Sequence, residues 1–95
     1  MRITFEPAAR DDLERIFAWL LNENPRAALE TLARIEARLD RLASPELAHM
    51  GRPGLVEGTR ELIEYPYIIV YTVHDDTGEI VVVSVMHGAR LRDSP

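Results

Sequence analysis

The sequence predicts one α+β domain, in which a hairpin of two helices packs on a small antiparallel sheet in the order β-α-α-β-β-β. Two segments in the first half repeat apolar residues at helical spacing. Three segments in the second half are rich in β-branched and aromatic residues instead. Helices grouped together and strands grouped together are typical of an α+β fold and not of an alternating α/β fold.

Length and composition predict a single domain spanning residues 1–95, with a hydrophobic fraction of 46% and a core of modest size. The chain contains no cysteine, which excludes disulfides and thiolate chemistry and agrees with a reducing compartment. The sequence has neither the pattern of a secretory signal nor an apolar run of the ~20 residues that span a bilayer. We therefore expect a cytoplasmic protein with no membrane partner.

The net charge of −5 argues against a protein that coats nucleic acid by bulk attraction. All 11 basic residues are arginine. This bias agrees either with a GC-rich genome or with planar recognition of carboxylate or phosphate, and composition does not separate the two.

The first half contains one short strand and two helices. Ile3 and Phe5 alternate with polar residues, and Pro7 suits the first position of a helix. Asn24 is a good N-cap before Pro25, so the chain turns there into a second helix. The first stripe is Leu13, Ile16, Phe17, Leu20 and Leu21, and the second is Ala28, Leu32, Ile35, Leu39 and Leu42.

The second half contains the strands. Residues 46–58 are rich in breakers and predict a loop, residues 59–64 alternate as a strand, and Tyr65-Pro66 predicts a tight connection. Residues 67–73 and 79–86 form a hairpin around a polar turn. The run Val81-Val82-Val83 lacks alternation, so this strand is either covered on both faces or has one face awaiting a partner. We favour the second interpretation because two helices cover only one face.

His87 is the best candidate for chemistry, because an imidazole transfers protons near neutral pH. Arg60 and Arg90 are candidates for holding a phosphate beside it. The alternative is that His87 bonds to backbone at a strand end and that each arginine forms an ion pair. Tyr65, Tyr67 and Tyr71 are candidates for stacking on bases. Tyr67 and Tyr71 share one face, which favours core packing for both.

A metal or cofactor site is not expected. The spacing of His49, His74 and His87 matches no metal motif that we know. The segment Gly51-Arg52-Pro53-Gly54 lacks the lysine and the strand-to-helix setting of a phosphate-binding loop.

Four segments, in this order and spacing, resemble the RelE/ParE superfamily of type II toxin–antitoxin toxins over nearly the whole chain. They are Ala9-Arg10-Asp11-Asp12-Leu13, residues 51–54 with Gly58-Thr59-Arg60-Glu61-Leu62, Pro66-Tyr67-Ile68-Ile69-Val70-Tyr71, and Val85-Met86-His87-Gly88-Ala89-Arg90. The resemblance implies a toxin in a hetero-oligomer with a cognate ParD/RelB-like antitoxin, whose C-terminal segment wraps on the sheet and helices.

The branches of this superfamily differ in their target. RelE-like members cut mRNA in the ribosomal A site, whereas ParE-like members poison DNA gyrase and are not nucleases. Of the basic RelE-like pattern only Arg90 matches clearly, Ile68 stands where that branch has arginine, and the late tyrosine is missing. The resemblance is therefore closer to ParE, and it implies a non-enzymatic protein that uses Arg60, Tyr65, His87 and Arg90 to bind its target or partner.

Two alternatives remain at this point. One is a ribosome-dependent endoribonuclease with His87 as acid or base and with Arg60 and Arg90 on the phosphate. The other is a remnant of the fold that binds its partner and is no longer toxic.

Overall fold

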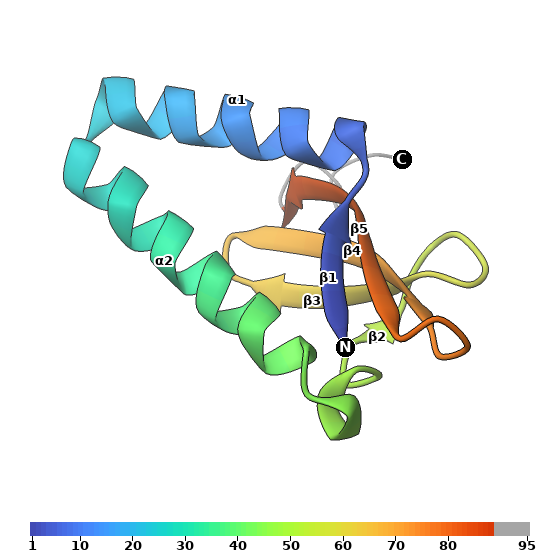
Figure 1. The fold of residues 1–95 in the computed structure, drawn as a ribbon. Coiled ribbons are helices and arrows are strands. Elements are labelled where there is room, and N and C mark those ends of the chain that lie inside the picture. The colour runs from blue at the N-terminus through green and yellow to red at the C-terminus, as the bar shows by residue number, and fades with distance from the viewer. Residues whose placement is uncertain (89–95) are drawn as a thin grey trace.

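The computed structural model describes residues 1–88, which form a helical hairpin packed on a five-stranded sheet (Figure 1). This arrangement confirms the predicted α+β class. In chain order the elements are β1 (Arg2–Phe5), α1 (Pro7–Glu23), α2 (Pro25–Leu42), the short 3-10 helix η1 (Pro45–Leu47), β2 (Arg52–Pro53), β3 (Arg60–Glu64), β4 (Tyr67–His74) and β5 (Glu79–His87).

The sheet is mixed, with the strand order β1-β5-β4-β3-β2. Strands β2 to β5 pair antiparallel, as predicted, but β1 runs parallel to β5, so the prediction of a wholly antiparallel sheet is wrong. The reason is that no tight turn joins β1 to β5. Both helices and the other strands lie between them in the chain, and such a long connection permits a parallel pair.

Strand β2 lies inside the segment that was predicted to be a loop. Arg52 and Pro53 pair with Glu61 and Arg60 of β3 at the edge of the sheet. A proline is tolerated there because an edge strand has one side without ladder hydrogen bonds. Two residues are too few for a recognisable strand pattern, and only the partner strand makes them one.

The helices begin and end where the sequence predicts. Asn24 caps α2, since its side-chain oxygen accepts hydrogen bonds from the backbone N–H groups of Arg26 and Ala27 at 3.1 and 3.2 Å. Four of the five predicted stripe residues of α2 are buried and Leu32 is half-buried, whereas the α1 stripe is at most half-buried and its Leu21 is 41% exposed. Leu21 lies in the last turns of α1, near the closed end of the hairpin (Figure 1).

A β-bulge explains why the valines of β5 do not alternate. Val70 pairs with Ser84 but Tyr71 pairs with Val82, so Val83 has no partner on β4. The extra residue changes the parity of β5: Ile80 and Val82 enter the core before the bulge, and Val85 enters it afterwards. Strand β5 is also central in the sheet, between β1 and β4.

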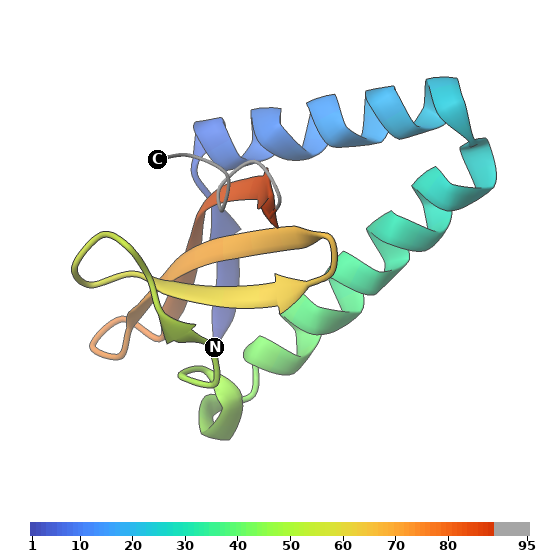
Figure 2. The same cartoon turned by 180° about the vertical axis from the view of Figure 1, so that it is seen from behind.

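The core lies between the helices and one face of the sheet. Its fully buried side chains include Ile35, Leu42, Ile69, Tyr71, Ile80 and Val82. The closed end of the helical hairpin extends past the sheet, and the β2–β3 loop lies at the other end of the molecule (Figure 1, Figure 2), whose longest dimension is 41 Å. Within residues 1–88, neither helix combines the length and the apolar character that crossing a bilayer requires.

Candidate functional site

Two of the predicted site residues, Tyr65 and His87, lie at the same end of the sheet. His87 is paired with Tyr67 across the β4–β5 ladder, and the two rings meet edge to face with centroids 5.6 Å apart. The backbone N–H of Gly88 donates to the carbonyl of Pro66 at 2.7 Å, which ties the end of β5 to the β3–β4 turn. Tyr65, in that turn, is 83% exposed, so this end presents an aromatic ring to solvent.

Beside Tyr67, one carboxylate is paired with two arginines. Glu64 lies 3.8 Å from Arg34 and 3.4 Å from Arg38, and Arg38 also donates to the carbonyl of Ile63 at 3.1 Å. Burial raises the pKa of the Tyr67 hydroxyl, and the positive charge of Arg34 partly opposes that rise. Tyr67 packs in the core, which agrees with the prediction from its parity.

Arg60 lies elsewhere, at the base of the β2–β3 loop. Its guanidinium donates to the carbonyl of Gly51, and the Gly51 N–H donates to the buried Tyr71 hydroxyl at 3.0 Å. Neighbouring Glu61 is 4% exposed and forms an ion pair with Arg52 at 2.9 Å. The predicted alternative of an ion pair therefore applies to Glu61 with Arg52, whereas Arg60 binds a backbone carbonyl.

The structure does not bring Arg60 and His87 together. Arg60 lies opposite Tyr71 and His87 lies opposite Tyr67, on the two sides of β4. From the ~3.3 Å rise per residue and the ~4.8 Å spacing between strands, their Cα atoms are roughly 16 Å apart. Arg90, the third candidate, lies outside the described residues.

The three histidines are dispersed. His49 lies 3.3 Å from Asp75, and His74 shares a hydrogen bond of 2.9 Å with Thr72. His87 contacts an aromatic ring, as described above. Within residues 1–88, no three side chains of the histidine, aspartate or glutamate types gather as metal ligands.

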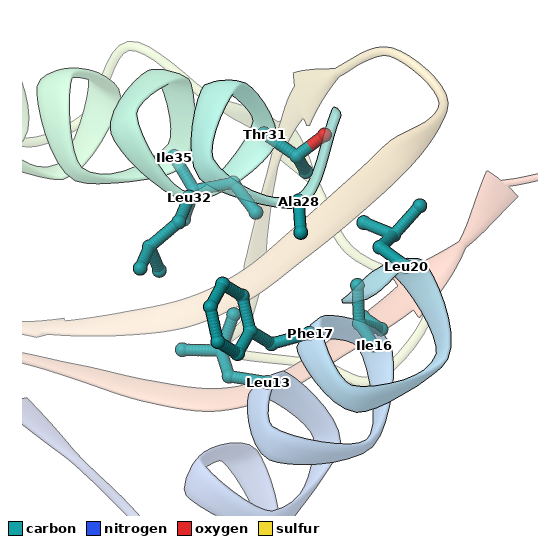
Figure 3. A pocket seen from close by; sticks show the side chains of 8 residues that line it. All are labelled: Leu13, Ile16, Phe17, Leu20, Ala28, Thr31, Leu32 and Ile35. Atoms are coloured by element: carbon teal, nitrogen blue, oxygen red, sulfur yellow. The ribbon is translucent and has the colours of Figure 1, made fainter. Parts of the chain in front are cut away.

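An apolar surface on the helical hairpin was not predicted. A groove runs between α1 and α2, and its lining side chains face each other across the helices (Figure 3). They are Leu13, Ile16, Phe17, Leu20, Ala28, Thr31, Leu32 and Ile35. Trp19 and Leu29, on the same two helices, are each 62% exposed. Trp19 lies off the predicted apolar stripe of α1. A tryptophan at such a position was the sequence signal that could have indicated an exposed apolar surface.

A second apolar surface lies at the tip of the β2–β3 loop. Leu55 is 75% exposed and Val56 is 69% exposed. The sequence analysis assigned this segment to a loop from its glycines and did not consider the apolar pair between them. Exposed aliphatic residues in a glycine-bounded loop were the signal that was missed.

Comparison with known families identifies the fold and the class of protein. The sequence model described as "ParE toxin of type II toxin-antitoxin system, parDE" matches residues 3–92. The chain belongs to this ParE toxin family. It is also 38% identical over 88 residues to "Putative toxin Y4kP" of Sinorhizobium fredii, an alignment that covers 90% of this chain and 86% of the relative.

Solved toxin structures share the fold of this chain. The chromosomal ParDE system of P. aeruginosa matches with a TM-score of 0.76 at 23% identity, over 92% of this chain and 95% of that one. The RelBE2 complex of Mycobacterium tuberculosis matches at 0.64 and 25% identity, over 90% and 95% of the two chains. The E. coli RelBE complex matches at 0.61 and 15% identity, over 90% and 94%. The resemblance to the RelE/ParE superfamily is confirmed, and the family model over residues 3–92 is that of the ParE toxins.

Proposed function

We propose that this ParE-family toxin arrests growth by binding DNA gyrase in the cytoplasm, without cutting RNA, and that a cognate antitoxin neutralises it by direct binding. The observation that carries the first part is the separation of Arg60 from His87. The two groups that a nuclease would use on one phosphate lie on opposite sides of β4, with His87 opposite its first residue, Tyr67, and Arg60 opposite Tyr71 in its middle.

RNA cleavage needs a proton acceptor, a proton donor and positive charge around a single phosphate. The Cα atoms of Arg60 and His87 are roughly 16 Å apart, and His87 packs edge to face on Tyr67. Arg60 is also bound to the Gly51 carbonyl, and Arg34 and Arg38 near Tyr67 are both paired with Glu64. The net charge of −5 further disfavours docking on ribosomal RNA.

The helical hairpin supports the proposed antitoxin surface. The apolar lining between its helices and the exposed Trp19 and Leu29 offer a partner helix an apolar face with a large aromatic contact. The similar solved structures include two toxin–antitoxin complexes of the RelBE type. Tyr65 and His87 would extend this surface, and Arg90 remains a proposed contact. We expect the toxin and its antitoxin to form a hetero-oligomer.

Purified components separate gyrase from the ribosome as the target. The toxin is incubated with gyrase and supercoiled plasmid, and separately with programmed ribosomes. We expect gyrase-dependent linear DNA, and we expect His87→Ala to retain it. Cleavage of mRNA in the A site, lost in His87→Ala, would establish the nuclease instead. A chain that binds antitoxin but leaves both targets and growth unaffected would be a non-toxic member of the fold.

The antitoxin surface has its own test. Trp19→Ala is expected to weaken antitoxin binding by roughly 30-fold or more, as for a central interface aromatic. Met50→Ala is the control, because Met50 is apolar and 38% exposed but lies outside the helices. Equal effects of the two variants would remove the hairpin from the proposed interface.

A further inference from the structure

The tip of the β2–β3 loop exposes two adjacent aliphatic side chains that nothing within residues 1–88 covers. Leu55 and Val56 are 75% and 69% exposed, more than Trp19 or Leu29 on the hairpin. Loops usually carry polar residues at such positions, because apolar area in water is unfavourable. A pair of exposed aliphatic residues at one tip therefore indicates a contact surface.

The loop is ordered by its own hydrogen bonds. The backbone N–H of Gly54 donates to the carbonyl of Thr59 at 2.8 Å, and the N–H of Thr59 donates to the carbonyl of Val56 at 3.0 Å. Gly58 has a φ of 87°, a left-handed conformation that a side chain would strain. The tip is thus held in one shape before any partner binds, which lowers the entropic cost of binding.

The base of the loop is held by the core. Arg60 donates to the Gly51 carbonyl, Gly51 donates to the buried Tyr71 hydroxyl, and Arg52 is paired with Glu61. These contacts give Arg60 a positioning role: it fixes the strand that leads into the loop. A side chain at the tip is therefore fixed relative to the sheet.

The position and charge of the tip indicate its occupant. The β2–β3 loop lies at the opposite end of the molecule from the closed end of the helical hairpin (Figure 1, Figure 2), so its tip is separate from the proposed antitoxin surface. Its one charged residue, Glu57, is exposed and forms no ion pair within the described part of the chain. Two aliphatic side chains cover far less than the ~800 Å² that each partner buries in a standard interface, so the tip is too small to hold a dimer of this chain by itself and acts as one contact within a larger interface.

We propose that the loop tip inserts Leu55 and Val56 into an apolar pocket of the protein that the toxin arrests, with a lysine or arginine at the pocket rim facing Glu57. This inference rests on the proposed function, because it assumes a protein target. A membrane is disfavoured as the occupant, since the tip carries an acidic residue and the chain has a net charge of −5.

Two leucines of similar exposure form a matched pair for the test. Leu55→Ala lies at the loop tip, and Leu29→Ala, 62% exposed in the wild type, lies on the hairpin. Each full-length variant is measured for growth arrest, for binding to purified gyrase, for binding to its antitoxin and for urea unfolding. We expect Leu55→Ala to bind gyrase about 30-fold more weakly and to lose growth arrest, with antitoxin binding and unfolding unchanged. We expect Leu29→Ala to affect antitoxin binding alone.

A charge reversal extends the test. Glu57→Arg should weaken gyrase binding and slow association, because like charges would then meet at the pocket rim. Full growth arrest by Leu55→Ala would overturn the proposal, as would binding of the wild type to phosphatidylcholine or phosphatidylserine vesicles that depends on Leu55. Loss of arrest in Leu55→Ala without any gyrase binding by the wild type would refute gyrase as the target and retain the loop as the contact. A wild type that neither arrests growth nor binds gyrase would refute both proposals.

Discussion

Removing the Tyr71 hydroxyl tests whether the core holds the β2–β3 loop through one buried hydrogen bond. Tyr71 is 0% exposed, and its hydroxyl accepts the Gly51 N–H at 3.0 Å. Tyr71→Phe keeps the ring and its packing. It removes a bond worth about 1 kcal/mol and leaves the buried Gly51 N–H without its acceptor, at a cost of about 1–3 kcal/mol. Because these two terms overlap, we expect a loss of about 2 kcal/mol in the free energy of unfolding.

The measurement is urea unfolding followed by circular dichroism. A loss of this size is a large share of the ~5–15 kcal/mol by which a typical domain resists unfolding. It lowers the melting temperature by roughly 8–16 °C. The slope of the free energy of unfolding against urea concentration should not change, since the surface exposed on unfolding is the same. Tyr65→Phe, at an 83% exposed tyrosine, is the control and should change stability by less than about 0.5 kcal/mol. If Tyr71→Phe loses no more than this control, Gly51 does not depend on the hydroxyl and the reasoning fails.

Three further predictions concern single contacts. Gly51→Ala should lower the free energy of unfolding by more than Tyr71→Phe does, because a Cβ at Gly51 would lie 2.6 Å from a backbone carbonyl oxygen. A variant as stable as the wild type in urea would contradict this close packing. Asp12→Asn should lower the free energy of unfolding by about 1–2 kcal/mol, since the carboxylate accepts the Val85 N–H at 3.0 Å and joins α1 to β5. An unchanged free energy of unfolding would show that the charge of Asp12 is not needed. The raised pKa of Tyr67 means that its neutral form stabilises the fold at pH values below the ordinary tyrosine value of about 10, and that this contribution is lost as the pH rises through the folded-state pKa. The free energy of unfolding should thus fall above about pH 10, where the absence of lysine and cysteine leaves few other groups to titrate. Tyr67→Phe should flatten this dependence on pH. An unchanged fall in the variant would refute its assignment to Tyr67.

Local sequence patterns sufficed where an element's own residues determine it. The two helices, the cap at Asn24 and the turn before β5 depend on residues a few positions apart, and the structure has them as predicted, although the stripe of α1 is at most half-buried. Element order and helix pairing followed from short connections. The bulge at Val83 was beyond this reasoning, because a run of valines has the same composition whether or not one residue lacks a partner across the ladder.

The candidate site shows the same difference between local patterns and contacts that form across the fold. The sequence singled out strand ends as candidate sites and placed Arg60 and His87 in one group because each lies at the end of a strand. Strand register decides which ends meet, and it set these two roughly 16 Å apart. Register depends on pairs of residues distant in the chain, so it is invisible to a pattern within one strand.

By itself, the sequence determined the fold class, the helical hairpin and the likeness to the RelE/ParE toxins, because periodicity, caps and ordered motifs are carried by neighbouring residues. Only the tertiary structure decided that β1 runs parallel to β5, that Arg60 holds a loop, and that Leu55 and Trp19 remain exposed at opposite ends. Direction, hydrogen-bond partners and exposure are properties of what surrounds a residue in space. The surfaces proposed for the target and for the antitoxin arise from those properties. The strand that ends in His87 lies beside the surface proposed for the antitoxin.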